Sequence, residues 1–536
     1  MQTRVLGGEG GRRGFFGGSH GRSRTVGLII VAVVGALATI MFQTVGLLAS
    51  VLAAGLVFVG TIRTHRGSPL VRLQARRRWR ERVRLGTVDF APVAARPPEL
   101  AEARGGSRRE RKALVRAWNT YRDWPDGAEG MYWLQRGRRE PGIAWHAPRG
   151  EDAYLSVAFA VEGQIRGIEG NAFLDGAMRA WGDLLARYGS TSSLPTRVQS
   201  LTRVVPVDSA YHEAWVMDHL AADAVPELVA SYDEVVRLVS HSGLMQRHYV
   251  IIRWPLTATF LAAAARRGPA QEGWRALMSA EITAARSHLA TAKLGRVTAI
   301  SAGQLAAVLR HMQTPSWPID QVGDVEVDAP WVPSHDELSA TITTGPGPDG
   351  ALEQWWHRTA LIPIEAMETG PRGSMWLAPL LSQLTHPIVR TLSLQTEVIP
   401  AADARQGART DVTTDLADLE AQREKGVLTS EELAAGLKAA RSRLDDLRPG
   451  SGHHGAGWAG HLTISARSRD DLIDATAKIT EAASNAGISS LDWLDTQQAA
   501  AGACTWPIAR GMRPPGRSTA SALRTLLAGS GSKEAI

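Results

Sequence analysis

The longest apolar stretch of this chain, residues 25–62, contains no formal charge: TVGLIIVAVVGALATIMFQTVGLLASVLAAGLVFVGTI. A helix rises ~1.5 Å per residue and the hydrocarbon core of a bilayer is ~30 Å thick, so about 20 residues make one pass. The stretch is nearly twice that length, with its most polar dipeptide, Gln43-Thr44, near the middle and Gly46 just beyond. Because lipid offers the backbone no hydrogen-bond partners, each half should be helical. We predict a two-helix transmembrane hairpin that turns at residues 43–46.

A secretory signal peptide and one long kinked helix are the competing interpretations of this stretch. A signal peptide would have a shorter apolar region and a small-residue cleavage site. The flanks decide between one pass and two, because residues 1–24 carry five arginines and residues 63–84 carry nine, each against one acid. Positive charge marks the cytoplasmic flank of a membrane helix, and only two passes leave both flanks on that side. We therefore expect a multi-pass protein of the inner or plasma membrane with both termini in the cytoplasm.

The arginines that follow the hairpin include Arg76, Arg77, Arg78 and Arg80. A basic block beside a membrane helix is first explained by anionic lipid, which contributes ~1 kcal/mol per Lys or Arg near the surface. Contact with DNA is the alternative for the same residues, and it would be strongly salt-dependent. The sequence thus predicts a membrane-surface or nucleic-acid contact at these four arginines.

Glycines inside the apolar stretch are candidates for helix packing. Gly35, Gly46, Gly55 and Gly60 lie among many alanines. Small residues let transmembrane helices approach closely. We predict that these four glycines pack against helices of other membrane subunits.

The rest of the chain is long enough for two or three domains with real cores, and its composition is that of an ordinary globular protein. A single cysteine, Cys504, rules out an internal disulfide and fits a reducing compartment. Composition shifts predict the following division: 1–24 disordered and basic, 25–62 transmembrane hairpin, 63–112 basic juxtamembrane segment and linker, 113–314 first α+β domain, 315–350 Pro/Gly-rich linker or insertion, 351–510 second α+β domain, and 511–536 flexible tail.

Hydrophobic periodicity predicts strand–helix units in both large segments. Alternation indicates strands at 154–161, 196–205, 247–254, 389–399 and 461–466, and an edge or bulged strand at 359–364 because Pro363 cannot donate to a ladder. Helical spacing indicates helices at 173–188, 210–239, 271–293, 302–312, 375–384 and 470–485. The overall expectation is a cytoplasmic α+β region behind the membrane hairpin.

Residues 411–447 differ from the strand–helix units around them. Leu433, Leu437, Leu444 and Leu447 follow a break at Gly426 with near-heptad spacing. We predict a helical hairpin that is inserted into the second α+β domain and projects from its sheet.

No pattern in the sequence predicts chemistry. Residues 17–21 match G-x-S-x-G, but no strand precedes them, as a nucleophile elbow requires. His453, His454 and His461 lack a nearby Cys, Asp or Glu to complete a metal site. Cys504 lies in an Ala-rich segment typical of a small buried side chain. We therefore predict no catalytic, cofactor-binding or metal-binding residues, and a protein that is not an enzyme.

The order of these elements resembles an actinobacterial family of integral membrane proteins found with type IV secretion and conjugation systems. A basic start and a two-helix hairpin are similar to the small inner-membrane subunit of such systems. The body is similar to the N-terminal, non-catalytic domain of the conjugation motor ATPase: the strand at 154–161, the helices at 411–447, the strand at 461–466, the helix at 470–485 and the apolar segment 499–507 (AAAGACTWP) carry the likeness. The family supplies no catalytic residues, and no phosphate-binding loop is present in this sequence.

The resemblance implies a non-catalytic structural subunit that anchors and docks a separate motor ATPase. Its partners would be that ATPase, other membrane subunits in a hetero-oligomer, and anionic lipid. Three alternatives remain open: the two-helix membrane subunit of a type VII secretion machine, a membrane-tethered enzyme whose site forms only in the fold, and a DNA-binding protein.

Overall fold

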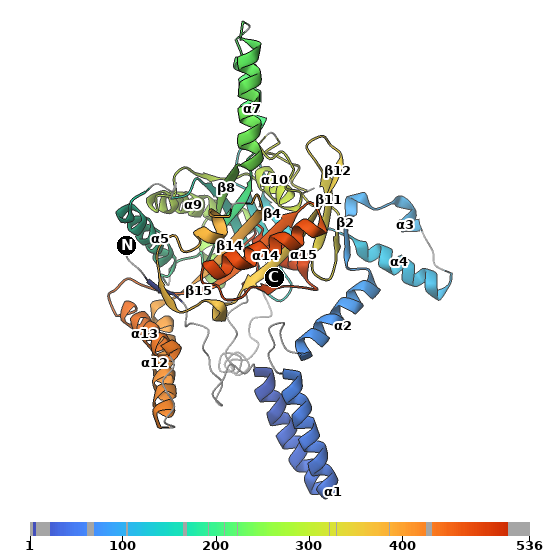
Figure 1. The fold of residues 1–536 in the computed structure, drawn as a ribbon, viewed down its shortest axis with the longest axis vertical. Helices are drawn as coiled ribbons and strands as arrows, with labels where there is room; N and C mark the ends of the chain where they lie inside the picture. Colours follow the sequence, from blue (N-terminus) through green and yellow to red (C-terminus); the bar gives the residue numbers. More distant parts are fainter. Residues whose placement is uncertain are drawn as a thin grey trace.

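The computed structural model of the chain (Figure 1) describes twelve segments of the sequence: 4–6, 22–61, 69–102, 106–164, 169–190, 192–207, 210–221, 223–320, 322–328, 330–384, 386–424 and 431–512. A long apolar helix near the N-terminus is followed by a large mixed α/β region built on one 14-stranded sheet. The helix extends from one end of the molecule, away from that sheet (Figure 1).

The apolar stretch forms one helical element, α1 (Arg22–Thr61), where the sequence predicted two separate helices. By length and composition the described residues contain one candidate membrane span, Leu28–Thr61, so two separate passes are not shown. Its helical course is interrupted at Gln43, whose φ is 43° and ψ −119°. A Cβ added at Gly35 would lie 2.7 Å from Ser50 Oγ, whereas these residues would be roughly 22 Å apart in a straight helix. The interruption therefore brings the two halves of α1 side by side (Figure 1).

The segment predicted as a juxtamembrane linker is partly folded. Its basic part forms α2 (Pro69–Leu85), and β2 (Asp89–Pro92) then enters the large sheet. Short helices follow, η1 (Val93–Ala95) and α3 (Pro98–Glu102), before α4 (Arg108–Thr120) and β3 (Tyr121–Arg122). Composition suggested a linker because Pro and Gly interrupt the periodicity, but β2 is held by pairing with β10 and β3, which the sequence cannot show.

One sheet runs through most of the described body. Its strand order is β3-β2-β10-β11-β12-β15-β14-β7-β8-β6-β5-β4, with β16 beside β12 and β9 beside β6. The remaining strands of this order are β4 (Met131–Gln135), β5 (Ile143–His146), β6 (Tyr154–Val161), β7 (Arg197–Pro206), β8 (Leu244–Pro255), β9 (Val297–Ala299), β10 (Ser334–Asp336), β11 (Thr341–Pro346), β12 (Leu352–Ile362), β14 (Val389–Ile399), β15 (Gly455–Ala466) and β16 (Asp492–Trp493). The pairs are antiparallel apart from β2 with β3, which is parallel.

The ladder between β7 and β14 connects strands from the two predicted α+β domains. Arg390 pairs with Val204 and Glu397 with Arg197, so hydrogen bonding continues across the predicted boundary. The division into two folding units stays a prediction, and so does the choice between a linker and an insertion for the segment 315–350. That segment contains β10 and β11, which pair with each other inside the sheet.

The strand expected at an edge, 359–364, is β12 (Leu352–Ile362), which lies between β11 and β15. Pro363 comes directly after its last residue, so it does not interrupt the ladder. The strands expected at 154–161 and 389–399 are β6 and β14, which have the same bounds. These two predictions are confirmed.

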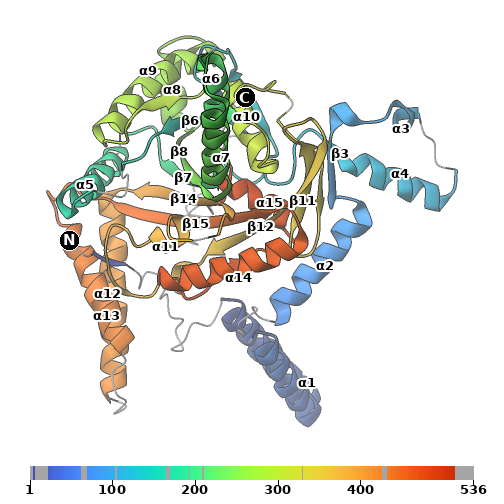
Figure 2. The same ribbon diagram turned by 45° about the horizontal axis from the view of Figure 1, so that its top comes forward.

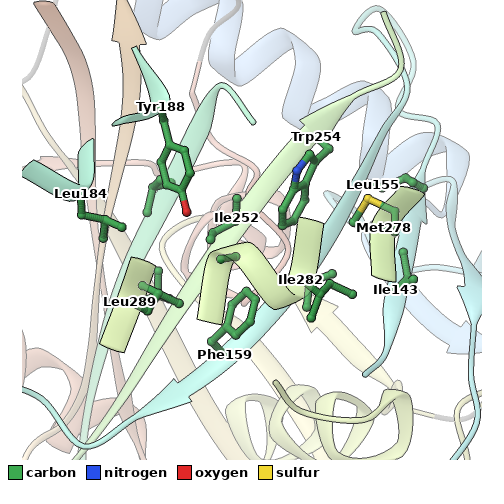
Figure 3. Packing of buried hydrophobic residues seen from close by; sticks show 14 of the residues in the cluster. Ile143, Leu155, Phe159, Leu184, Tyr188, Ile252, Trp254, Met278, Ile282 and Leu289 are labelled. Carbon is green, nitrogen blue, oxygen red and sulfur yellow. The ribbon is translucent and has the colours of Figure 1, made fainter. Parts of the chain in front are cut away.

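Helices cover the apolar face of the sheet. α5 (Asn171–Tyr188), α8 (Ala258–Ala265) and α9 (Ala270–Thr291) bury their side chains with the faces of β6 and β8 that carry Phe159 and Ile252 (Figure 3). Farther along the same face, α14 (Arg469–Asn485) and the short α11 (Ala378–Leu381) cover β14, β15 and β12 (Figure 2). α14 begins after its N-cap Ser468, whose side chain accepts a hydrogen bond from the amide of Asp471.

The opposite face is covered by α10 (Ala302–Gln313) and by the C-terminal segment 495–511. That segment includes α15 (Gln498–Gly502) and η3 (Ala503–Thr505). Trp506 and Ile508 pack there with Tyr154 and Ile251 of the sheet. The remaining elements are η2 (Ile364–Ala366), and β1 (Arg4–Leu6) with β13 (Gly370–Arg372), which form a two-stranded sheet.

Residues 4–6 were expected to be disordered, and their pairing with β13 corrects that expectation. The remaining predictions for 1–21 and for 513–536 lie outside the described residues.

Two helical pairs project from the body. The predicted hairpin at 411–447 consists of α12 (Ala401–Glu424) and α13 (Glu431–Asp446), which meet through Leu419 and Leu437. The second pair, α6 (Ala210–His219) and α7 (Pro226–Ser242), replaces the single long helix-biased stretch that the sequence indicated.

Candidate functional site

The predicted contact residues Arg76, Arg77, Arg78 and Arg80 lie on α2 and are exposed. α2 lies between α1 and the edge of the large sheet (Figure 1), where a membrane that holds α1 would be closest. Helical geometry places these consecutive arginines around much of the helix circumference rather than on one narrow face.

Arg82 belongs to the same basic run but has a different role. Its guanidinium lies 2.6 Å from Asp126 Oδ2 and 2.8 Å from Asp336 Oδ2. It also donates a 3.0 Å hydrogen bond to the carbonyl of Thr496. Arg82 therefore attaches α2 to the sheet and to the C-terminal segment, and it is not available to a ligand.

A second basic helix, missed by the sequence interpretation, lies against α2. α4 is anchored to α2 by Arg116, which donates to the carbonyl of Val83 at 2.6 Å, and by Asn119, which donates to that of Leu85 at 2.7 Å. We call the following exposed cations of the two helices the basic surface: Arg72, Arg76, Arg77, Arg78, Arg80, Arg84, Arg108, Arg109, Arg111 and Lys112. Such a density of guanidinium groups suits phosphate groups, whether of lipid or of nucleic acid.

The predicted packing glycines fall into two groups. A Cβ at Gly46 would lie 2.2 Å from the carbonyl oxygen of Ala38, and Gly35 faces Ser50, so both glycines permit contact between the two halves of α1. Gly55 and Gly60 have no atom within 4 Å of such a Cβ. These two glycines face open space and are therefore free to contact another helix.

The sheet face beneath the C-terminal segment is polar and buried. Alternate residues of β12, β14 and β15 contribute hydroxyl, amide and imidazole groups to it: His357, Thr359, Thr391, Ser393, Gln395, His461, Thr463 and Ser465. A cavity of about 40 Å³ lies within this polar face and is also lined by Arg203 of β7. That volume is enough for one or two water molecules.

Hydrogen bonds bind the C-terminal segment to this polar face. Gln199 donates to the carbonyl of Trp506 at 2.9 Å and accepts from the amide of Ala509 at 2.9 Å. Thr505 Oγ1 lies 2.8 Å from Thr463 Oγ1, and Tyr154 donates to the carbonyl of Ile508 at 2.7 Å. These bonds fix the C-terminal segment on the polar face, whereas the side-chain amide of Gln395 and Nδ1 of His461 in the same face are buried without a hydrogen-bond partner.

A larger groove of about 820 Å³ lies between the end of α5, α8 and α9. Glu281 in its wall accepts a 3.0 Å hydrogen bond from the indole of Trp254. Tyr188 Oη and His288 Nδ1 are buried beside it without a hydrogen-bond partner, and their rings are 6.1 Å apart. Burial raises the pKa of the Tyr188 hydroxyl and lowers that of the His288 imidazole, so both groups are uncharged at neutral pH. These groups do not form a proton relay with one another.

The histidines considered as metal ligands and the single cysteine show no arrangement suited to metal binding or nucleophilic attack within the described residues. Among the described residues no group of three or more His, Cys, Asp and Glu side chains could hold a metal ion. His461 is buried in β15, and burial lowers its pKa to about 4. Burial also raises the pKa of the Cys504 thiol to about 12, which leaves it protonated and a poor nucleophile.

The polar sheet face and the groove were both missed by sequence reasoning. Alternating Ser, Thr and Gln in a strand is the pattern of a solvent-exposed face, and only the packing of 495–511 shows that this face is buried. The groove combines the end of α5 with α8 and α9, which follow α5 in the chain only after β7, α6, α7 and β8.

No protein-family model matches this chain, and no curated protein matches it. Its function must therefore be argued from the arrangement described above.

Proposed function

We propose that this chain is a non-catalytic, membrane-anchored structural subunit of a transport machine of the type IV secretion or conjugation kind, which docks a separate motor ATPase. The observation that carries the proposal is that an exposed apolar helix and a basic helix follow one another at one end of the molecule. The apolar side chains of α1 are largely exposed, and the arginines of α2 follow directly. An exposed apolar helix beside a basic helix is what a membrane anchor at an anionic leaflet requires.

We further propose that the two halves of α1 cross the membrane as two passes. The side-by-side contact of Gly35 with Ser50 and of Gly46 with Ala38 supports two antiparallel helices joined at Gln43. Both flanks would then be cytoplasmic, as their arginines favour. A cysteine at Thr44 should react with a membrane-impermeant maleimide added to intact cells or spheroplasts, whereas a cysteine at Arg77 should react only after lysis. Equal protection of both positions would contradict the two-pass topology.

The body supports a role in assembly. Two helical pairs, α6–α7 and α12–α13, project from the sheet and offer surfaces for other proteins (Figure 1). Among the described residues the buried histidines and Cys504 carry pKa shifts that burial explains, which favours a structural role for them.

The two-helix membrane subunit of a type VII secretion machine is the second candidate, since it combines the same kind of anchor with a cytoplasmic domain. The long α12–α13 hairpin favours the type IV alternative. A relaxase or coupling-protein gene beside this one would support conjugation.

Co-purification tests the proposed function. The tagged full-length chain should be extracted from its native membrane in mild detergent, and the associated proteins identified by mass spectrometry. We expect a motor ATPase and further membrane subunits in stoichiometric amounts. A version lacking residues 22–61 is the control for membrane-dependent assembly. Purification of the full-length chain alone would contradict the proposal.

A further inference from the structure

The second projecting pair, α6 and α7, occupies a long insertion between two paired strands. β7 and β8 pair as far as Pro206 and Leu244, the amide of Val207 still donates to the carbonyl of Gly243 at 3.0 Å, and α6 and α7 lie in the connection between the two strands. We call residues 210–242 the α6–α7 projection. It stands out from the end of the body opposite to α1 (Figure 1). Its two helices meet where His212 and Tyr232 share a 2.6 Å hydrogen bond.

Large apolar side chains on the α6–α7 projection remain exposed despite this contact. Leu228 and Val235 of α7 are 68% and 52% exposed, and Trp215 of α6 is 58% exposed. Met217, Val225 and Leu238 are exposed as well. Covering apolar side chains of this size favours association, and tryptophan is enriched among the residues that dominate binding energy. A concentration of such groups on a projecting element marks a protein-interaction surface.

The charge of the α6–α7 projection identifies the kind of partner. Its sequence holds six acids and a single arginine, Arg237; the acids are Glu213, Asp218, Asp223, Glu227, Asp233 and Glu234. The chain as a whole has a net charge of +7, so the projection is acidic within a basic protein. A surface complementary to it would carry Lys and Arg around an apolar groove.

The position and charge of the projection argue against two other occupants, the membrane surface and a second copy of this chain. A membrane that holds α1 would lie at the opposite end, and anionic lipid would repel the acids. A second copy offers only another acidic projection at the same height, because both copies would be anchored in one membrane. The basic surface begins on the α1 side of the body, whereas the projection lies at the opposite end (Figure 1).

We propose that the α6–α7 projection docks a cytoplasmic partner protein through a basic, apolar-lined helical surface of that partner. The inference rests on the proposed membrane anchoring, and it supplies the docking surface that the proposed function requires. The apolar side chains contribute affinity, and the acids select the partner and accelerate association.

The test uses the full-length chain in nanodiscs of phosphatidylcholine and two fluorescent amphipathic helical peptides. Both peptides have leucines at i, i+3, i+4 and i+7; one has Lys and Arg beside them and the other Glu. We expect the basic peptide to bind at least tenfold more tightly than the acidic one, as measured by anisotropy. Its affinity should fall with added salt.

Three variants locate the binding. An apolar variant (Trp215→Gln, Leu228→Gln, Val235→Gln) should lose at least tenfold in affinity for the basic peptide, because glutamine keeps the helix propensity and removes the apolar surface. A charge variant (Asp218→Asn, Glu227→Gln, Glu234→Gln) should lose about tenfold and much of the salt dependence. The matched control (Leu352→Gln, Ile473→Gln), which alters exposed apolar residues elsewhere, should bind within twofold of the unaltered chain.

Several outcomes would overturn this inference. Unchanged binding by the apolar variant, or equal binding of the two peptides, would exclude this surface or this class of partner. Self-association of the unaltered chain in sedimentation, lost in the apolar variant, would identify a second copy as the occupant. An apolar variant that still co-purifies with an ATPase at full yield would overturn the docking surface and leave the proposed function standing. A chain that binds the basic peptide but purifies alone would overturn the proposed function instead.

Discussion

At the scale of single residues, burial decides the protonation of His357. Its Nε2 lies 3.0 Å from the carbonyl oxygen of Gln313, and its Nδ1 lies 2.8 Å from Ser465 Oγ. Because a carbonyl can only accept, Nε2 carries the proton and Nδ1 accepts from the serine. Desolvation lowers the pKa of this imidazole to about 4. The sequence shows a histidine in a strand, and nothing in the strand pattern indicates its neutral tautomer.

We predict that His357 makes the stability of this protein sensitive to acid. Its pKa is about 4 in the folded chain, compared with ~6.5 when unfolded. The unfolded chain therefore takes up the proton first as pH falls, and the free energy of unfolding decreases between those two values. The contribution of neutral His357 to the free energy of unfolding is present at pH 7, and roughly 2 kcal/mol of this contribution is lost by pH 5.

Urea unfolding of the full-length chain at pH 7 and at pH 5 measures this loss. His357→Gln should reduce the difference between the two pH values by about 2 kcal/mol, because glutamine does not titrate. The exposed His453→Gln is the control and should leave the difference unchanged. An equal pH dependence in the two variants would refute the assignment to His357.

The roles of the arginines after α1 also cannot be told apart from the sequence alone. Charge alone groups Arg82 with Arg76 and Arg80. Only the positions of Asp126 and Asp336, distant in sequence, separate a structural arginine from exposed ones.

At the scale of elements, periodicity was most informative where one side of an element is apolar along its whole length. β6, β14, α9 and α14 match their predicted positions closely. It failed for β10 and β11, which are short and lie among prolines and glycines, and which are ordered by neighbouring strands. Pairing energy comes from residues outside the local window, so no local pattern reveals it.

The glycines of α1 provide a prediction at this scale. Gly35→Leu should separate the two halves of α1, because a Cβ there already lies 2.7 Å from Ser50 Oγ. Gly55→Leu meets no atom within 4 Å in the chain itself, so it should leave the halves together and act only on contacts with other helices.

Ala32 and Val51 both line a groove between the two halves of α1, and a disulfide between cysteines placed at these two positions reports on the contact of the halves. Its yield in native membranes should fall several-fold with Gly35→Leu and stay constant with Gly55→Leu. Co-purification of partner membrane subunits should weaken with Gly55→Leu. An unchanged disulfide yield with Gly35→Leu would show that the halves do not pack through this glycine.

At the scale of the whole molecule, charge is distributed along its long axis. The basic surface of α2 and α4 lies toward α1, and the acidic α6–α7 projection lies at the other end (Figure 1). In the proposed membrane arrangement, this polarity would turn the basic surface toward an anionic leaflet and the projection toward the cytoplasm.

The basic surface should bind anionic lipid. For a chain lacking residues 1–61, we expect flotation with phosphatidylglycerol vesicles and little with phosphatidylcholine. Replacing Arg76, Arg77, Arg78 and Arg80 with glutamine should weaken this binding by up to several hundredfold at low salt, at ~1 kcal/mol per arginine. The exposed pair Arg266→Gln and Arg267→Gln on another face is the control. Preferential binding of duplex DNA over the vesicles, lost in the same quadruple variant, would favour the nucleic-acid alternative.

The sequence by itself determined the apolar stretch, the basic flank behind it and most long helices and strands, because each depends on residues close together in the chain. The tertiary structure decided what those elements contact. It placed Gly35 beside Ser50, joined β7 to β14, buried the polar face under 495–511 and left the apolar side chains of α6 and α7 exposed. These outcomes depend on which distant segments meet. A pattern of apolar and polar residues indicates which face of an element can be buried, but it does not indicate which distant segment covers that face.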